Sequence, residues 1–463
     1  MNIDAKKRNK ILLLLFVGVL MGALDIAIVG PALPAIQAEF IVSTRQMAWI
    51  FNIYVLVSLI STPLMAKLSD RFGRRSIYIL DVALFVSGSL IVASARSYPV
   101  MIVGRAVQAV GSGGILPVAA AVIGDTFPPE KRGGALGLIG AVFGIAFLIG
   151  PVLAGFVLKF AGWHWLFLIN LPIGLVLMVA AARMLPATRP EQRKPFDFKG
   201  VLLLSLILGP LAFGITGLDR NLPMMGMGEP LIGGAILFAL VLIPLFWGVE
   251  KQAADPVFQP RLFSSKQMNI AGILSIGTGM AETSVVFLPS LAVAGLGMTA
   301  HQASFWMIPT VIALAIGSPL AGRLLDRIGS KIVVQAGLLL VAGGFFMFGM
   351  AGTNMTWFVV GQVLSGFGLS ALLGAPLRYV VLNEAGAAQR GAAQGLLSVM
   401  LSMGQLGGAA LVGAIAASFS ADDPRGFMQS FMLIGAVVAV MTMLALGLKN
   451  RAAERASTAA VSA

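Results

Sequence analysis

The chain has 463 residues, of which 58% are hydrophobic and 11% charged, and its mean hydropathy is +0.93. A soluble domain carries about 25% charged residues, so this composition excludes a soluble protein and indicates a chain that crosses a membrane repeatedly. The formal net charge of +13 does not indicate nucleic-acid binding, because the basic residues lie between apolar runs, as membrane topology requires. The absence of cysteine excludes disulfides and thiol sites.

The chain begins with a basic cluster at residues 6–10, followed by an apolar run from Ile11 to Pro34. This run is longer than the apolar region of a signal peptide and has no clear cleavage site, so we predict a retained first helix. A helical span needs about 20 apolar residues. Further spans are predicted, in chain order, at residues 47–66, 76–95, 98–124, 134–157, 163–185, 200–218, 231–249, 268–292, 302–322, 331–351, 355–382, 391–418 and 427–448.

The predicted fold class is an all-α polytopic membrane protein with 14 transmembrane helices, arranged as two pseudo-symmetric six-helix bundles plus two inserted helices. The polar segments divide the chain into four predicted regions. They are an N-terminal six-helix bundle at 1–185, linkers with two extra helices at 186–266, a C-terminal six-helix bundle at 267–448, and a cytoplasmic tail at 449–463.

The distribution of basic residues predicts the orientation. With the N-terminus inside, the inner loops and tails hold 26 of the 32 Lys and Arg residues and the outer loops hold 5, while Arg105 lies within a span. A wrong number of spans would scramble this asymmetry, since every later loop would change sides. We therefore predict that both termini are cytoplasmic.

A short motif occurs twice. PLMAKLSDRFGRR at 63–75 returns as PLAGRLLDRIGSK at 319–331, at an offset of 256 residues. The matched positions are Gln46, Pro63, Leu64, Leu68, Asp70, Arg71 and Gly73 with Gln302, Pro319, Leu320, Leu324, Asp326, Arg327 and Gly329. Glycines of the predicted fifth span, Gly137, Gly150 and Gly155, return at an offset of 258 as Gly395, Gly408 and Gly413. The two halves are therefore predicted to be duplicates of one another.

The segment from Leu68 to Arg75 resembles the pattern G-x-L-x-D-R-x-G-R-[RK] of the major facilitator superfamily, with Ala66 in place of the opening glycine. The resemblance implies a transporter built from two parallel six-span repeats around a site near the membrane midplane. The predicted 14 spans narrow the resemblance to the drug:proton antiporter branch, which is multidrug-efflux-like.

The resemblance also implies an inner gate of charged residues at the cytoplasmic ends of the spans. Its candidates are Asp70, Arg71, Arg74, Asp125, Asp326 and Arg327. In the family the first acid faces the start of a helix in the other half, here near Arg390, and a helix N-terminus favours such an anion. The alternative is that these charges only set the topology.

Asp25 lies 14 residues into the first predicted span, about 21 Å along the helix axis and past the midplane of a core about 30 Å thick. An acid at this depth costs roughly 2.5–3.5 kcal/mol on insertion scales, so we expect it to face a polar interior or to be protonated. Burial favours the neutral acid, as a proton carrier requires. Residues 24–34 also resemble the signature L-D-x-T-V-V-N-x-A-L-P of the fourteen-helix antiporters. The alternative is a structural hydrogen bond to a neighbouring helix.

Glu282 lies at the matching depth of the other half, since Gly22 and Gly279 align at an offset of 257. We predict that Asp25 and Glu282 form a near-symmetric pair that faces one cavity and binds protons, a cationic substrate, or both. The alternative is a hydrogen bond between helices.

Arg105 and Gln108, in the run RAVQAVG, resemble the proton-linked R-x-x-Q-G pattern of the family, with Ala109 in place of its glycine. The resemblance implies a cation beside Asp25 that substrate binding releases, and a place for Gln108 in the substrate site. The alternative is that Arg105 extends to the nearby outer surface.

Gly150, Pro151 and Gly155 resemble the antiporter motif that ends G-P-x-x-G-G, in which small residues let helices approach and the proline makes a bend. The alternative is glycine-rich packing, which is compatible with the functional interpretation. Residues 163–172 resemble the family's W-x-W-x-F-x-I-N-x-P, whose aromatic residues anchor the membrane interface. Asp81 is interpreted as a surface acid, and the glycines at 111–114 as packing residues.

No ATP-binding P-loop motif occurs, so we expect a proton gradient as the energy source, without a cofactor or a metal. The predicted function is a proton-coupled antiporter of a bacterial-type inner membrane that exports amphipathic, cationic small molecules by alternating access. It is expected to be a monomer without enzymatic activity, whose partners are its small-molecule substrate, protons and the bilayer. The alternatives are a facilitator or proton symporter of a metabolite and, less favoured, a non-transporting membrane sensor.

Overall fold

The structure is a computed structural model that describes residues 4–186, 197–218, 229–253, 256, 260–384, 390–420 and 422–454. All regular structure in these residues is helical. The first half contains α1 (Ala5–Phe40), α2 (Thr44–Phe72), α3 (Arg74–Ala93), α4 (Tyr98–Thr126), α5 (Pro129–Phe160), α6 (His164–Leu168) and α7 (Asn170–Met184). The inserted pair is α8 (Phe198–Gly217) and α9 (Pro230–Gln252).

The second half contains α10 (Lys266–Val285), α11 (Leu288–Leu296), α12 (Ala300–Phe305), α13 (Ile308–Ile328), α14 (Ser330–Ala351), α15 (Met355–Leu373), α16 (Ala375–Glu384), α17 (Arg390–Ala417) and α18 (Arg425–Leu444), with the short 3-10 helices η2 (Pro260–Ser264) and η4 (Ala445–Gly447). Within the described residues, 12 segments are long and apolar enough to cross a membrane, and the α10–α11 pair, bent by 43°, raises this to 13. The 32-residue α5 is the remaining predicted span. The all-helical, multi-pass fold class is confirmed, and the structure is consistent with 14 spans.

The sequence repeat has a local structural cause. Ser43 and Thr299 cap the helices that begin the second span of each half, and the backbone N–H of each donates to Oε1 of the glutamine three residues later, over 2.9 and 3.0 Å. These glutamines, Gln46 and Gln302, are the repeated pair, and each closes a capping box. Their recurrence follows from this requirement of the helix N-terminus.

Gly73 and Gly329 separate the second and third spans of each half. Their φ values are 94° and 87°, a region that only glycine occupies without strain. The repeated glycine of the motif is therefore fixed by a tight turn between α2 and α3, and between α13 and α14.

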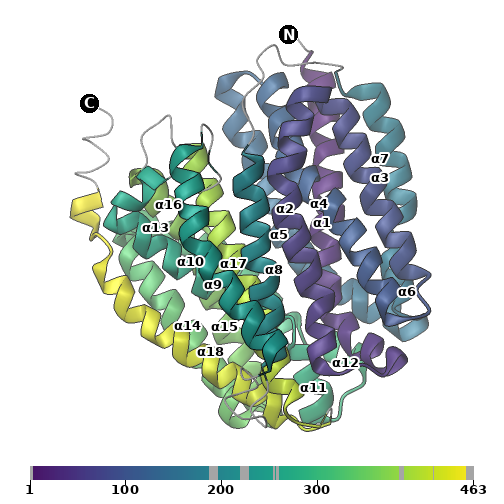
Figure 1. Cartoon of the computed structure of the whole chain (residues 1–463), viewed down its shortest axis with the longest axis vertical. Coiled ribbons are helices and arrows are strands. Elements are labelled where there is room, and N and C mark those ends of the chain that lie inside the picture. Colours follow the sequence, from purple (N-terminus) through teal and green to yellow (C-terminus); the bar gives the residue numbers. More distant parts are fainter. Residues whose placement is uncertain are drawn as a thin grey trace.

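The two bundles meet mainly at one end (Figure 1). We call the end at which α1 begins and α18 ends the termini side, and the opposite end the far side. Far-side contacts join α1 to α11 and α12, α5 to α12 and α13, and α2 to α17. A Cβ on Gly30 would lie 2.7 Å from the carbonyl oxygen of Val286, and one on Gly413 would lie 2.6 Å from Cβ of Ala48. These distances show that the helices of the two bundles are in direct contact there.

On the termini side, the first bundle has its own apolar cluster, built from the spans between α1 and α7. The far-side residues of the same bundle belong instead to a cluster that is continuous with the second bundle. The bundles therefore share a core on the far side and have separate cores on the termini side. This is an asymmetric arrangement, in which the far side is closed.

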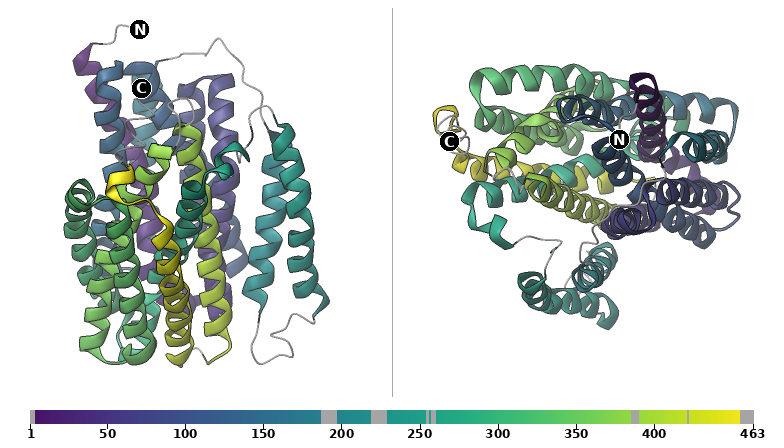
Figure 2. Two further views of the ribbon diagram at one scale, coloured as in Figure 1. Left: turned by 90° about the vertical axis from the view of Figure 1, so that its left-hand side faces the viewer. Right: turned by 90° about the horizontal axis from the view of Figure 1, so that it is seen from above.

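The inserted helices α8 and α9 pack against each other at the periphery (Figure 2). α8 contacts α2 and α17, one helix from each bundle, and Arg45 Nη2 donates to the carbonyl oxygen of Leu218 over 3.2 Å. Much of α9 is exposed, which is expected for a helix that faces lipid.

Repeat-related glycines bring helices together within each bundle. A Cβ on Gly150 would lie 2.5 Å from Cβ of Ala27 in α1, and a Cβ on its repeat partner Gly408 would lie 2.6 Å from the carbonyl oxygen of Met280 in α10. The pairs α1–α5 and α10–α17 are thus equivalent crossings, as the repeated glycines predict.

Substitution of Gly404 tests this packing, since a Cβ there would lie 1.9 Å from the carbonyl oxygen of Ile276. Gly404→Ala forces α17 away from α10, and we expect a loss of about 1–3 kcal/mol in the free energy of unfolding, measured by thermal denaturation in detergent. Gly407→Ala, one turn away on the same helix, is the matched control, because nothing lies within 4 Å of its added Cβ. Equal destabilisation by both substitutions would contradict the close crossing.

Candidate functional site

The carboxylate of Asp25, in the middle of α1, is fully buried and holds two polar partners from α4. Arg105 Nη1 donates to Asp25 Oδ2 over 2.6 Å, and Gln108 Nε2 donates to Asp25 Oδ1 over 2.7 Å. Arg105 Nη1 also donates to Gln108 Oε1 over 2.6 Å. Of the predicted proton-coupling residues Asp25, Glu282 and Arg105, the structure brings Asp25 and Arg105 into direct contact, and it adds Gln108, a predicted substrate-site residue, to the same cluster.

Two further residues complete this network. Gln108 Nε2 donates to Ser89 Oγ of α3 over 2.8 Å, and Asn170 Nδ2 of α7 donates to the same oxygen over 3.1 Å. Asn170 Nδ2 also lies 3.5 Å from Asp25 Oδ1. We call Asp25, Arg105, Gln108, Ser89 and Asn170 the α1 acid network. It ties together four helices of the first bundle.

Arg105 is also enclosed by aromatic side chains. Its Cζ lies 4.1 Å from the ring centroid of Tyr54 and 5.7 Å from that of Phe167, and its Nε donates to the carbonyl oxygen of Ile50 over 3.3 Å. Cation–π contacts of this kind strengthen when water is excluded. Since Arg105 is 0% exposed, the alternative in which it extends to the outer surface is wrong.

The close approach of α3 and α4 positions the network. A Cβ on Gly88 would lie 2.3 Å from the backbone nitrogen of Gln108, so the two backbones touch and Ser89 is brought beside the Gln108 side chain. Removing one partner of a buried ion pair costs about 3–5 kcal/mol, whereas an intact pair adds little net stability over apolar packing. Such a pair is therefore better suited to switching between two conformations of the bundle than to stabilising one conformation alone.

Glu282, in α10, has a different environment. Its Oε2 accepts a hydrogen bond from Gln405 Nε2 of α17 over 2.9 Å, and the residue is partly exposed. No described residue links it to Asp25. The expectation that both acids face one cavity is therefore wrong for this conformation, because Arg105 and Gln108 hold Asp25 inside its own bundle.

The internal repeat explains this difference. Arg105 and Gln362 occupy equivalent positions at an offset of 257, as do the flanking glycines Gly104 and Gly361. The second bundle thus has a neutral amide where the first has a guanidinium. Gln362 is fully buried, and neither its Nε2 nor its Oε1 has a partner among the described residues. The second bundle therefore offers Glu282 no cation at the position equivalent to Arg105.

The predicted inner-gate residues lie at the termini side. Arg74 Nε and Asp125 Oδ2 form an ion pair of 3.1 Å, and Arg74 Nη1 donates to Ser69 Oγ over 2.7 Å. Arg71 and Arg327 are exposed. The side chains of Asp70, Asp326 and Arg390 lie outside the described residues.

Asp125→Asn removes one charge of the gate pair. Because the Asp125 side chain is 39% exposed, we expect the free energy of unfolding to fall by less than about 1 kcal/mol. A gate role predicts a much larger effect on transport, with a changed cross-linking yield between cysteines placed at the termini-side ends of α2 and α17. The native chain has no cysteine to interfere. Unchanged transport and cross-linking would leave topology as the role of the pair.

The glycines of the candidate antiporter motif lie in close contacts. Gly150 packs on Ala27, two residues from Asp25, and a Cβ on Gly155 would lie 3.0 Å from the ring of Phe305 in the second bundle. Pro151 lies inside α5, which continues through it as one helix. The motif therefore connects the helix of Asp25 to the far-side contact between the bundles.

Some residues around Asp25 are not predicted by the sequence. Ser89 and Tyr54 gave no signal, since single Ser and Tyr residues are common in helical spans. The sequence indicates Asn170 only as part of an aromatic interface motif. The interpretation of Asp81 as a surface acid is wrong, because this residue of α3 is fully buried where α3 packs against α4.

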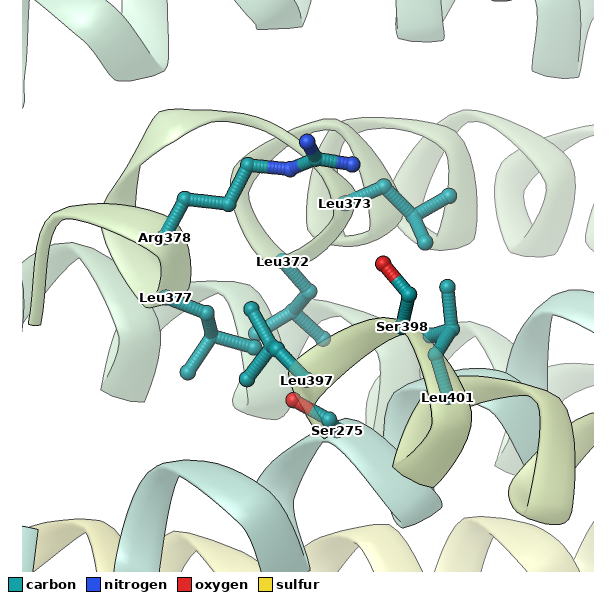
Figure 3. A pocket seen from close by; sticks show the side chains of 8 residues that line it. All are labelled: Ser275, Leu372, Leu373, Leu377, Arg378, Leu397, Ser398 and Leu401. Carbon is teal, nitrogen blue, oxygen red and sulfur yellow. The ribbon is translucent and has the colours of Figure 1, made fainter. Parts of the chain in front are cut away.

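A small pocket lies in the second bundle (Figure 3). It is lined by Ser275, Leu372, Leu373, Leu377, Arg378, Leu397, Ser398 and Leu401, from α10, α15, α16 and α17. Its lining is mainly leucine, and the guanidinium of Arg378 lies along one side. The pocket contains neither Asp25 nor Glu282, so it is separate from the α1 acid network.

Comparison with known proteins gives consistent matches over most of the chain. The Major Facilitator Superfamily model matches residues 15–281 and again 268–462. The "Uncharacterized MFS-type transporter YfiU" of Bacillus subtilis (strain 168) is 37% identical over 407 residues, covering 87% of this chain and 78% of that protein. "Multidrug resistance protein 3" of the same organism is 30% identical over 411 residues, with the same two coverages. A crystal structure of a variant of the nucleoside transporter NupG has a TM-score of 0.68 at 13% identity, covering 94% of this chain and 99% of that chain, and this likeness concerns the fold alone.

Proposed function

We propose that this chain, which belongs to the Major Facilitator Superfamily, is a proton-coupled antiporter that exports amphipathic, cationic small molecules. Family membership makes it a multi-pass membrane transporter; the coupling ion, the substrate class and the direction are the proposal. The observation that carries the proposal is the fully buried contact of Asp25 with Arg105 and Gln108. The similarity to a protein named for multidrug resistance supports the substrate class.

The proposed coupling step is a change of partners at Asp25. When Asp25 is ionised, Arg105 and Gln108 bind it and draw α1 against α4. When Asp25 accepts a proton, one charge of the ion pair disappears and the attraction that holds Arg105 is lost. A proton can shift a conformational equilibrium only through such a difference between two states. Protonation of Asp25 therefore favours a different packing of the first bundle.

This step would be transmitted to the bundle contact through α1 and α5. Ala27, close to Asp25, packs on Gly150, and Gly155 of the same helix packs on Phe305 of the second bundle. Gly30 of α1 also touches Val286 at the break between α10 and α11. A shift of α1 would consequently disturb the far-side contacts that keep the bundles together, and alternating access requires such a disturbance.

Glu282 would attract the cationic substrate. It is partly exposed, and its described partner is the neutral amide of Gln405. A carboxylate in a water-poor site that lacks an internal counter-ion interacts favourably with a cation. The first bundle would thus bind the proton, and the second bundle would bind the positive charge of the substrate.

The remaining parts of the proposal are the location and the energy source. We place the protein in a bacterial inner membrane as a monomer, with both termini in the cytoplasm and the proton gradient as its energy source, without a bound cofactor. In that orientation the termini side is cytoplasmic, and the described conformation is closed toward the outside.

Everted membrane vesicles test this function. With an imposed pH gradient, acid inside, vesicles that contain the protein are expected to accumulate a fluorescent amphipathic cation, and a protonophore is expected to release it. Vesicles without the protein are the control. Accumulation that does not depend on the pH gradient would indicate a facilitator. Movement of the compound out of acid-loaded vesicles together with protons would indicate a symporter.

A further inference from the structure

The first bundle contains a second buried acid that the α1 acid network does not use. Asp81, in α3, is 0% exposed, and its carboxylate lies directly against Gly114 of α4. A Cβ on Gly114 would lie 2.2 Å from both carboxylate oxygens. Neither oxygen has a hydrogen-bond partner among the described residues. Ionised acids are rarely left unpaired in such a place, because desolvation strongly favours the neutral form.

The surroundings of Asp81 hold no described counter-charge. Tyr78, one turn earlier on α3, is also fully buried, and its hydroxyl has no described partner. That hydroxyl lies against Gly18 of α1, where a Cβ would be 2.0 Å from it. α4 presents Gly114, and α7 approaches this part of α3 through Gly174. Tyr78 is therefore the titratable group that faces Asp81 from the described parts of these helices.

The internal repeat shows that packing does not require an acid here. Gly111 of α4 would place a Cβ 2.2 Å from the carbonyl oxygen of Asp81, and its repeat partner Gly368 would place one 2.6 Å from that of Gly337. Asp81 and Gly337 are thus equivalent, and so are Gly114 and Ala371, at offsets of 256 and 257.

In the second bundle the alanine side chain takes the space. A Cβ on Gly337 would lie 3.0 Å from Cβ of Ala371. The two bundles therefore build the same helix crossing in two ways. In the first bundle an acid on α3 faces a glycine on α4, and in the second bundle a glycine on α14 faces an alanine on α15. The acid is an addition that the shared architecture does not need.

Two hydroxyl groups lie beside one face of α1, on the termini side of Asp25. Gly22 and Gly18 precede Asp25 by three and seven residues, which places all three on one face of the helix. Opposite Gly22 is the hydroxyl of Ser112, at 3.6 Å from a Cβ there, and opposite Gly18 is the hydroxyl of Tyr78. Tyr54 donates to Ser112 Oγ over 2.6 Å. The glycines leave these hydroxyls beside the helix that carries Asp25.

Asp81 is displaced from the α1 acid network toward the termini side. It precedes Ser89 by eight residues on α3, which corresponds to about 12 Å along the helix axis. The hydroxyls of Ser112 and Tyr78, beside Gly22 and Gly18 of α1, thus lie on the termini side of Asp25, as Asp81 does.

We propose that Asp81 is a second proton-binding group, which receives the proton from Asp25 and releases it on the termini side. In the transfer, the O–H bond of the Asp25 carboxylic acid breaks and Asp25 becomes the carboxylate that Arg105 binds. An O–H bond forms on the carboxylate of Asp81, which becomes the neutral acid. The described structure corresponds to the state after this transfer, with Asp25 paired and Asp81 unpaired. The transfer rests on the proposed antiport function, whereas the protonation of Asp81 does not.

Infrared spectroscopy of the purified protein tests the protonation without substrate or gradient. At neutral pH we expect a carbonyl stretching band of a buried carboxylic acid. The band is expected to disappear in Asp81→Asn and to remain in Asp25→Asn. A spectrum in which Asp81→Asn leaves the band unchanged, or in which no such band is present, would overturn the assignment of a proton to Asp81.

The repeat supplies a variant that keeps the packing. Asp81→Gly combined with Gly114→Ala copies the pair Gly337 and Ala371 of the second bundle, and its fold is checked by thermal denaturation. We expect it to lose the band and to lose accumulation driven by a pH gradient, while exchange of labelled for unlabelled substrate continues. Full gradient-driven accumulation by this double variant would overturn the transfer. If the wild-type protein itself shows no proton coupling, the antiport function fails and with it the transfer, whereas the band still decides whether Asp81 binds a proton.

Discussion

Asp25→Asn is expected to abolish accumulation driven by a pH gradient, because an amide cannot carry a proton. Its single oxygen can still accept a hydrogen bond from Arg105 or Gln108, which bind different oxygens of the Asp25 carboxylate. The substitution also leaves the guanidinium of Arg105 buried without a counter-charge. Loss of one partner from a buried pair costs about 3–5 kcal/mol of the free energy of unfolding. We therefore expect a lower melting temperature together with the loss of coupling.

A charge-neutral double variant separates these two effects. Asp25→Asn with Arg105→Gln removes both charges and places in the first bundle the residue type that the second bundle has at Gln362. We expect it to regain much of the thermal stability and none of the proton coupling. Recovery of gradient-driven transport along with stability would assign Asp25 a structural role, and normal transport by Asp25→Asn alone would remove it from the mechanism.

Glu282→Gln is expected to impair transport of cationic substrates far more than transport of neutral ones. Two unit charges 4 Å apart attract by about 4 kcal/mol at an effective dielectric constant near 20, and a loss of about 1.4 kcal/mol already weakens binding tenfold. We expect the apparent affinity for cations to fall at least tenfold in transport assays. Proton coupling is expected to persist for neutral substrates.

Gln405→Leu is the matched control for this substitution. It removes the hydrogen bond to Glu282 Oε2 but leaves the charge, so the preference for cations is expected to remain. If Glu282→Gln impairs cationic and neutral substrates equally, Glu282 belongs to the proton route or to a structural hydrogen bond. A fall in melting temperature with both Glu282→Gln and Gln405→Leu would identify the structural hydrogen bond.

The parts of the fold that depend on local sequence could be predicted. Long apolar runs indicate spans, and the capping boxes at Ser43 and Thr299 and the turns at Gly73 and Gly329 recur because short-range geometry demands these residues. Asp25, Arg105 and Gln108 were also predictable, because polar groups in the middle of apolar spans are costly and are seldom present without a partner.

The breaks within spans were less predictable. Residues 268–292 were predicted as one span, but the helix breaks between Val285 and Leu288 and bends by 43°. Pro289 lacks the N–H that would bond to the carbonyl oxygen of Val285, and Pro309 follows the similar break between α12 and α13. The sequence shows these prolines, but packing against neighbouring helices decides whether a proline interrupts a helix or lies within a continuous one, as Pro151 does in α5.

Asp81 shows why part of the site could not be predicted. Its distance from the end of a span is the same whether the side chain faces lipid, water or the bundle. Whether the Asp81 side chain is buried depends on the rotation of α3 about its axis and on Gly114 of α4. Asp81 and Gly114 are far apart in sequence. Ser89 and Asn170 depend in the same way on contacts between three different helices.

Proton movement by the purified protein in liposomes tests proton-coupled antiport most directly. A gradient of an amphipathic cation is imposed across the membrane without an initial pH gradient, and a dye inside the liposomes reports the internal pH. The account predicts that cation leaving the liposomes drives protons inward, so that the interior becomes acid, and that Asp25→Asn shows no change. Protons that move out together with the cation, or cation efflux without any change of pH, would contradict it.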